Sequence, residues 1–400
     1  MFPSIPTDDT HASTETIARD AISILRRLVG FDTTSSESNL SLIAYVEEYL
    51  SHYEVAVKRI ASSDGTKANL LATIGPRNAG GIILSGHTDV VPVIGQTWSS
   101  NPFELTERDG KLFGRGTSDM KSFLALSLAC IPQLKKHTLS RPITLAFSYD
   151  EEIGCFGAPD LIRALVDDGL GNSTVIVGEP TNMTIVNSHK GMAIFEVVVI
   201  GIEAHSSLAH EGISANMAAI EILSVLSKIA RDERSNHNDT RFNPPWSTLT
   251  VGTISGGTAS NILARECRFT FDLRRLPHRD INVVLKPFWE TIDNVRNRLK
   301  SINEQADVIV KEIASIPPLR QEPEGGAESL ATMISGANSY GLAVSYGAEA
   351  GQFQNAGLST VICGPGSISQ AHKPDEFIEI NQIEEGARFM ARMIEYVVKH

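Results

Sequence analysis

Three apolar, strand-like runs in this chain lead directly into histidine or acidic residues. The runs occupy residues 81–85, 143–147 and 175–177, and the polar residues that follow them are His87, Asp150 and Glu179. Open α/β sheets place their sites in the loops at strand ends. The pattern therefore predicts an α/β fold in which these side chains meet along one edge of a central sheet.

Helical and strand-like patterns alternate through the first half of the chain. Apolar residues recur at three-to-four spacing in residues 17–29, 40–50 and 120–134, whereas residues 69–74 and 82–84 are typical of strands. Alternation of this kind indicates an α/β domain.

The pattern changes near Lys190. Strand-like runs and helical patterns follow in the order 193–202, 215–229, 248–254, 267–273 and 281–299. This order is β-α-β-β-α-β if residues 307–312 supply the last strand. Because the candidate ligands stop at Glu179 and resume at His372, we expect a small α+β domain inserted into a larger one. The predicted boundaries are 1–188 and 303–400 for the larger domain and 189–302 for the insertion.

Composition limits the classes of partner. The 400 residues carry a net charge of -12 without a dense Lys/Arg block, so a nucleic-acid partner is not expected. No stretch is long and apolar enough to span a bilayer, and the N-terminus has no signal-peptide pattern, so we expect a cytoplasmic protein. The four cysteines are scattered without a CxxC pair, which favours reduced thiols. Any metal must then be bound through nitrogen and oxygen.

His87 and Asp89 form the first candidate ligand pair. Residues two apart on a strand face the same way, so Asp89 is placed to orient a metal-bound His87. An isolated pair of this type is more often an ordinary surface loop. Here it is one of five such clusters.

The other clusters are carboxylates and one late histidine. Glu151 and Glu152 are adjacent on extended backbone, so their side chains diverge, and one can bind metal while the other acts as a general base. Asp119 precedes a helix and is either an N-cap or a carboxylate that bridges two cations. Glu179 follows an apolar run where an unpaired carboxylate would be costly. His372, taken alone, would be a loop histidine.

These residues lie in motifs that resemble a known family. The motifs are Gly86-His87-Thr88-Asp89, residues 114–121, Asp150-Glu151-Glu152-Ile153-Gly154, Gly178-Glu179-Pro180-Thr181, His189-Lys190-Gly191, residues 204–207, residues 256–261 and residues 364–372. Together they resemble the acetylornithine deacetylase branch of the superfamily of co-catalytic zinc aminoacylases, carboxypeptidases and succinyl-diaminopimelate desuccinylases. The resemblance spans nearly the whole chain. It implies a zinc-exopeptidase-like catalytic domain with a mixed central sheet flanked by helices, and an inserted ferredoxin-like domain for dimerisation or closure.

The resemblance also implies a two-metal site. His87, Asp119 and Glu179 would hold one Zn²⁺, while Asp119, Glu152 and His372 would hold the other, with Co²⁺ as a substitute. Asp119 would bridge the two metals, and Glu151 would act as general base on the water between them. The implied reaction removes the acetyl group from N2-acetyl-L-ornithine, a step of arginine biosynthesis.

Three residues of the insertion are implied to contact a small N-acyl amino-acid substrate in a homodimer. His205 resembles the family histidine that reaches across a dimer to stabilise the developing oxyanion, although it would otherwise be a capping or surface histidine. Asn261 and Arg274 resemble the family's clamp for the substrate α-carboxylate, although Arg274 would otherwise be an exposed residue at a strand end.

Alternative functions remain at this stage. A related N-acyl amino-acid deacylase or a succinyl-diaminopimelate desuccinylase would use the same metals, because a fold and its motifs fix the reaction class better than the substrate. A catalytically silent, metal-binding dimeric scaffold is a more remote alternative.

Overall fold

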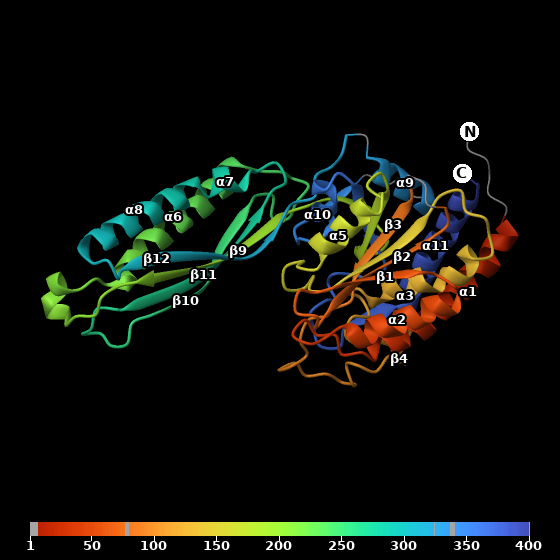
Figure 1. The fold of residues 1–400 in the computed structure, drawn as a ribbon, viewed down its shortest axis with the longest axis horizontal. Coiled ribbons are helices and arrows are strands. Elements are labelled where there is room, and N and C mark those ends of the chain that lie inside the picture. The colour runs from red at the N-terminus through yellow and green to blue at the C-terminus, as the bar shows by residue number, and fades with distance from the viewer. Residues whose placement is uncertain (1–6, 77–79, 324, 337–340, 400) are drawn as a thin grey trace. The chain divides into compact units, whose positions relative to one another are not determined.

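The computed structural model describes residues 7–76, 80–323, 325–336 and 341–399 (Figure 1). These residues form two compact units. The smaller unit comprises Ser188–Arg320 with Ala343–Gly347, and it interrupts the larger unit in sequence.

An eight-stranded mixed sheet forms the centre of the larger unit. Its spatial order is β1 (Val57–Ala61), β2 (Ala68–Ile74), β6 (Ile143–Ser148), β3 (Ile82–His87), β7 (Thr174–Pro180), β14 (Ser359–Gly364), β8 (Val186–His189) and β13 (Leu342–Val344). The four inner strands β6, β3, β7 and β14 run parallel to one another. Every residue of β3 and β6 is buried, as expected for parallel strands covered on both faces.

Parallel register aligns the strand ends that carry the candidate site. His87 at the end of β3 lies opposite Ser148 at the end of β6. The side chains that follow these strands therefore begin at the same edge of the sheet.

Helices cover both faces of this sheet. They are α1 (Thr7–Val29), α2 (Leu40–His52), α3 (Lys121–Ala129), α4 (Ile131–Leu134), α5 (Ala158–Asp167), α9 (Gly326–Ser335), α10 (Ala350–Asn355) and α11 (Ile380–Lys399). Residues of α1, α2, α3, α9 and α11 share one hydrophobic core with the strands. The helices α5 and α10 contact each other and the sheet outside that core.

Glycine allows α3 to approach the end of β7. A Cβ atom at Gly178 would lie 2.0 Å from the Phe123 ring of α3. Because Asp119 lies just before α3 and Glu179 follows Gly178, this close packing brings two candidate ligands together.

A small second sheet joins the end of the chain to the segment before α3. Its order is β15 (Phe377–Glu379), β5 (Lys111–Phe113) and β4 (Thr106–Arg108), with Phe377 paired to Phe113. The pairing draws residues 372–376 alongside residues 114–119.

The smaller unit is a four-stranded antiparallel sheet with two main helices. Along the chain it contains β9 (Gly191–Ile200), η1 (Ser206–Glu211), α6 (Ala215–Asn236), β10 (Thr248–Gly256), β11 (Glu266–Arg275), α7 (Ile281–Val284), α8 (Lys286–Ile302) and β12 (Asp307–Ile316). The sheet order is β10-β11-β9-β12, and α6 and α8 share its hydrophobic core. The predicted α/β class, with a separate small antiparallel-sheet domain, is confirmed.

Two details differ from the sequence predictions. The smaller unit ends at Arg320 rather than at residue 302, because β12 pairs with β9 and belongs to its sheet. Two patterns that each predicted one helix form two helices, with a proline at the start of the second. Residues 120–134 contain α3 and α4, with Pro132 in the first turn of α4. Residues 281–299 contain α7 and most of α8, with Pro287 in the first turn of α8. Among the described residues, no helix is long and apolar enough to cross a membrane.

Candidate active site

The structure brings seven of the ten predicted site residues together in the larger unit. They come from the end of β3, the segment after β6, the residue pair before α3, the end of β7 and the loop after β14, and they are His87, Asp89, Asp119, Glu151, Glu152, Glu179 and His372. Placement at the carboxyl ends of parallel strands agrees with the sequence prediction.

Asp119 lies between the two imidazoles. Its Oδ1 is 3.0 Å from His87 Nε2, and its Oδ2 is 3.5 Å from His372 Nε2. His87 Nε2 is also 4.0 Å from Glu179 Oε1, and His372 Nε2 is 2.9 Å from Glu152 Oε2. One carboxylate therefore presents a separate oxygen to each half of the site, which is the arrangement that a bridging ligand requires.

Two overlapping groups of potential ligand atoms result. His87, Asp119 and Glu152 have ligand atoms within 4.8 Å of one another, as do His87, Glu151 and Glu179. Imidazole nitrogen with carboxylate oxygen is a donor set that suits Zn²⁺.

Burial makes this concentration of negative charge costly without a cation. Burial, with Asp119 nearby, raises the pKa of Glu152 to about 7. Burial also raises the pKa values of Glu151 and Glu179. Hydrogen bonds with Asp119 and Glu152 raise the pKa of His372 to about 10. The folded chain thus favours protons on groups that a metal would require in their deprotonated form.

Glu179 gives the clearest evidence that the site fits a cation. Glu179 is 4% exposed, and its Oε1 has no hydrogen-bond partner among the described residues. Buried polar atoms are almost always paired, because an unpaired one loses its hydration without compensation. A cation between Glu179 and His87 would satisfy this oxygen.

Asp89 contacts more than the histidine it was predicted to orient. His87 Nδ1 lies 2.9 Å from the main-chain oxygen of Asp89 and 3.6 Å from its carboxylate Oδ1. The carboxylate accepts hydrogen bonds from Ser35 Oγ at 2.7 Å and from the backbone N–H groups of Glu151 and Glu152 at 3.1 and 3.2 Å. Asp89 therefore holds the backbone of both glutamates in place.

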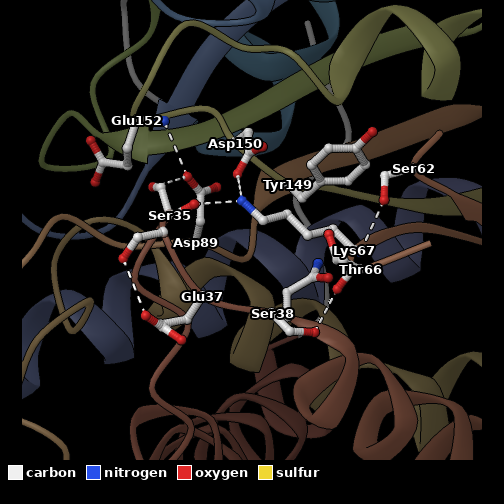
Figure 2. A network of polar contacts seen from close by, with 12 residues as sticks. Ser35, Glu37, Ser38, Ser62, Thr66, Lys67, Asp89, Tyr149, Asp150 and Glu152 are labelled. Atoms are coloured by element: carbon white, nitrogen blue, oxygen red, sulfur yellow. Dashed lines mark hydrogen bonds and ion pairs between the residues drawn. The ribbon is translucent and has the colours of Figure 1, made fainter. Parts of the chain in front are cut away.

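Lys67 bonds to two segments that contact Asp89, at Ser35 and at Asp150. Figure 2 shows the ion pair between Lys67 and Asp150, the residue before Glu151, and the hydrogen bond from Lys67 to the main-chain oxygen of Ser35. Lys67 thus links two of the segments that meet at Asp89. Sequence reasoning missed it, because nothing near Lys67 in the chain carries a ligand.

Buried groups beneath the strand ends were also missed. Glu349 is 1% exposed and accepts hydrogen bonds from Ser85 Oγ at 2.6 Å and Ser148 Oγ at 2.8 Å. These two serines belong to β3 and β6, so Glu349 ties α10 to the two strands that lead into the site. The sequence predicted no role for Glu349.

The remaining three predicted residues lie in the smaller unit. His205 caps η1, with Nδ1 2.8 Å from Ser207 Oγ, and is exposed. Asn261 is nearby, since its main-chain oxygen accepts from Ser206 N at 2.9 Å. Arg274 Nε bonds to Asp272 at 3.0 Å, and Arg274 lies at the end of β11. The capping role that was the ordinary alternative for His205 is thus observed.

Comparison with known proteins assigns the family. The model of peptidase family M20/M25/M40 matches residues 83–396. The acetylornithine deacetylase of Buchnera aphidicola subsp. Acyrthosiphon pisum (strain Tuc7) is 31% identical over 385 residues, covering 93% of this chain and 97% of that protein. The acetylornithine deacetylase of Myxococcus xanthus is 31% identical over 376 residues, covering 92% and 95%. An M20 family metallo-carboxypeptidase from Sulfolobus solfataricus has a TM-score of 0.74 at 18% identity, covering 94% and 98%, which shows the shared fold.

Proposed function

The chain belongs to peptidase family M20/M25/M40 as a metal-dependent hydrolase, and we propose that its substrate is N2-acetyl-L-ornithine, which it converts to L-ornithine and acetate. The site supports a di-metal amidohydrolase, chiefly because the two oxygens of Asp119 face two separate imidazoles. The substrate assignment rests on similarity along more than nine-tenths of the chain to acetylornithine deacetylases. On this assignment the enzyme serves arginine biosynthesis in the cytoplasm.

The residues present fit two divalent cations. His87, Glu179 and one oxygen of Asp119 would hold the first, and Glu152, His372 and the other oxygen of Asp119 would hold the second. We assign Zn²⁺ to both positions, with Co²⁺ as a substitute, because the same ligand types accept either ion. Bound cations would polarise the amide carbonyl and make water acidic enough to attack it at neutral pH.

Glu151 carries the proton in this proposal. Its carboxylate takes a proton from the attacking water, whose oxygen forms a new bond to the acetyl carbon. The bond from that carbon to the ornithine nitrogen then breaks, and Glu151 returns the proton to the departing nitrogen. The backbone hydrogen bond from Glu151 N to Asp89 Oδ1, 3.1 Å long, restrains the base during this cycle.

The smaller unit is assigned to substrate binding and dimerisation. Described hydrogen bonds from the Arg274 side chain use only Nε, so the terminal nitrogens of the guanidinium are available for a substrate carboxylate. We assign Asn261 to the same carboxylate and His205 to the developing oxyanion. Met217 and Ile220 on α6 are 62% and 56% exposed, and Ile254 on β10 is 60% exposed, which supports a homodimer contact on this unit.

Release of acetate tests the proposal. The metal-free chain is assayed on N2-acetyl-L-ornithine, N-succinyl-diaminopimelate and N-acetylmethionine before and after Zn²⁺ or Co²⁺ is returned. Metal-restored turnover mainly of acetylornithine is the expected result. Metal-dependent turnover mainly of another acyl amino acid would keep the reaction and reassign the substrate. Two bound metals without turnover of any of the three would favour the silent scaffold.

A further inference from the structure

Glu376 is a buried carboxylate to which the proposed reaction assigns no task. Its side chain is 1% exposed, as is that of Arg115, whose Nη1 donates to Glu376 Oε2 at 2.7 Å. The same oxygen accepts from Gly116 N at 3.1 Å, and Oε1 accepts from Ser118 N at 2.9 Å and Asp119 N at 3.1 Å. One carboxylate therefore receives four N–H groups from the segment that ends in the bridging ligand.

Glu376 also lies four residues after His372, a candidate ligand in the loop between β14 and β15. The side chain of His372 is 54% exposed, whereas those of Asp119 and Glu152 are each 6% exposed. The backbone of His372 has φ of 63°, in the left-handed region that non-glycine residues rarely adopt. Contacts outside regular structure must therefore hold this histidine at the site.

Those contacts converge on the Arg115–Glu376 pair. Arg115 Nη1 donates to the main-chain oxygen of Lys373 at 3.3 Å, and Arg115 Nη2 donates to Gln96 Oε1 at 2.6 Å. Gln96 Nε2 in turn donates to the main-chain oxygen of His372 at 3.0 Å. Residues 372 and 373, at one end of the segment, are thus bonded to Gln96 and Arg115. Glu376, at the other end, is bonded to Arg115 and to the backbone of residues 116–119.

We propose that Glu376 is a positioning residue that fixes His372 relative to Asp119 and so forms the second metal position. The inference rests on the proposed two-metal function. Glu376 touches neither substrate nor metal in this assignment. It acts by joining two ligand-bearing segments that are more than 250 residues apart in the chain.

The carboxylate form of Glu376 is essential to this role. Glu376→Gln would place an NH₂ group where one carboxylate oxygen now accepts hydrogen bonds. Whichever way the amide turns, it faces N–H donors, so at least two of the four hydrogen bonds are lost. Glu376→Asp keeps both acceptor oxygens but withdraws them by one methylene, and it should retain part of the effect.

Metal titration of the full-length, metal-free chain tests the inference. Calorimetry with Zn²⁺ and the visible spectrum of bound Co²⁺ resolve the two affinities without any use of activity. For Glu376→Gln we expect the second affinity to fall by about 10–100-fold, the range for residues that orient metal ligands. The first affinity, set by His87, Glu179 and Asp119, should change by less than the second. Glu376→Asp should lie between Glu376→Gln and the unchanged chain.

Glu233→Gln is the matched control. Glu233 is 4% exposed and pairs with Arg279 in the smaller unit, so its substitution also breaks a buried Glu–Arg pair. It should lower stability and leave both metal affinities unchanged. If Glu376→Gln does not fold, Gln96→Ala removes the hydrogen bond to the main-chain oxygen of His372 and one acceptor of Arg115, while the Arg115–Glu376 ion pair remains. It should weaken the second site alone.

The outcomes separate the two proposals. Equal affinities in Glu376→Gln and the unchanged chain, or an equal loss at both positions, would overturn the positioning role. An unchanged second affinity in Gln96→Ala would do so if only that variant folds. An unchanged chain that binds fewer than two metals would instead overturn the two-metal function.

Discussion

Exchanging each of two adjacent glutamates for glutamine should produce different defects. Glu152 Oε2 lies 2.9 Å from His372 Nε2 and is assigned as a ligand, whereas Glu151 is assigned as the base. The backbone N–H groups of both residues donate to the Asp89 carboxylate, and neither side-chain substitution removes these hydrogen bonds. Glutamine keeps the size of the side chain and removes its charge. Each effect therefore reports the chemistry of one carboxylate.

Glu151→Gln should keep both metals and lose turnover by about 10²–10⁴-fold, the usual contribution of a positioned base. At about 1.4 kcal/mol per factor of ten, this loss is about 3–6 kcal/mol of transition-state stabilisation. Glu152→Gln removes a direct ligand, so the second metal affinity should fall by at least about 10²-fold, more than for a residue that only orients a ligand. Its turnover should recover partly when metal is added in excess.

The assay combines metal content after dialysis, initial rates of acetate release and their dependence on added Zn²⁺. The rival assignment has structural support, because Glu151 has a ligand atom within 4.8 Å of those of His87 and Glu179. If Glu151→Gln lost metal while Glu152→Gln kept two metals and lost turnover, the roles of base and ligand would be reversed. If both variants kept metals and turnover, neither assignment would stand.

Three further predictions follow from the same geometry. Chelation should lower the unfolding temperature of the larger unit alone, because all six ligand and base residues lie there. Metal at about 1,000 times its Kd stabilises the folded state by about 4 kcal/mol per site. Calorimetry that showed an equal shift of both units would contradict this prediction. Metal affinity should fall as pH drops through about 7, because burial raises the pKa of Glu152 to about 7 and its proton must leave before metal binds. Titrations in buffers of different ionisation enthalpy measure the released protons. A metal affinity that does not change between about pH 6 and pH 8 would refute this prediction. Gly178→Ala should destabilise the fold by about 1–3 kcal/mol or more, because its Cβ would lie 2.0 Å from the Phe123 ring. Gly171→Ala is the control, because its Cβ would meet nothing within 4 Å. Thermal denaturation should show a lower unfolding temperature for Gly178→Ala than for Gly171→Ala.

The strand-end pattern predicted much of the site because it reflects a local property of the chain. An apolar run followed by His87 or Glu179 shows both the strand and the place where it stops, and parallel pairing then brings these ends together. Asp119 and His372 are different, since an acid before a helix or a histidine in a loop has common alternatives. Their joint role could be inferred only from the family resemblance.

Long-range partners explain what the sequence could not reveal. Glu376 and Arg115 form a buried pair across 261 positions, and Glu349 bonds to Ser85 across 264 positions. Glu376 lies only four residues after His372, but nothing in the local sequence names Arg115 as its partner or Ser85 as the partner of Glu349. The boundary of the smaller unit was placed too early, at residue 302, although the β-α-β-β-α-β pattern already included residues 307–312, which form part of β12 and pair with β9.

The two halves of the site are held by different means, and this difference gives them different stabilities. His87 and Glu179 belong to neighbouring buried strands, so the register of the sheet fixes the first position. His372 lies on a loop that is held by hydrogen bonds from Gln96 and Arg115 to the main-chain oxygens of His372 and Lys373. Glu376, in the same loop, accepts further hydrogen bonds from Arg115 and from the backbone before α3. Local opening costs least where backbone contacts are few and solvent is near. The first position should therefore fill before the second, and loss of the second metal should precede unfolding of the sheet.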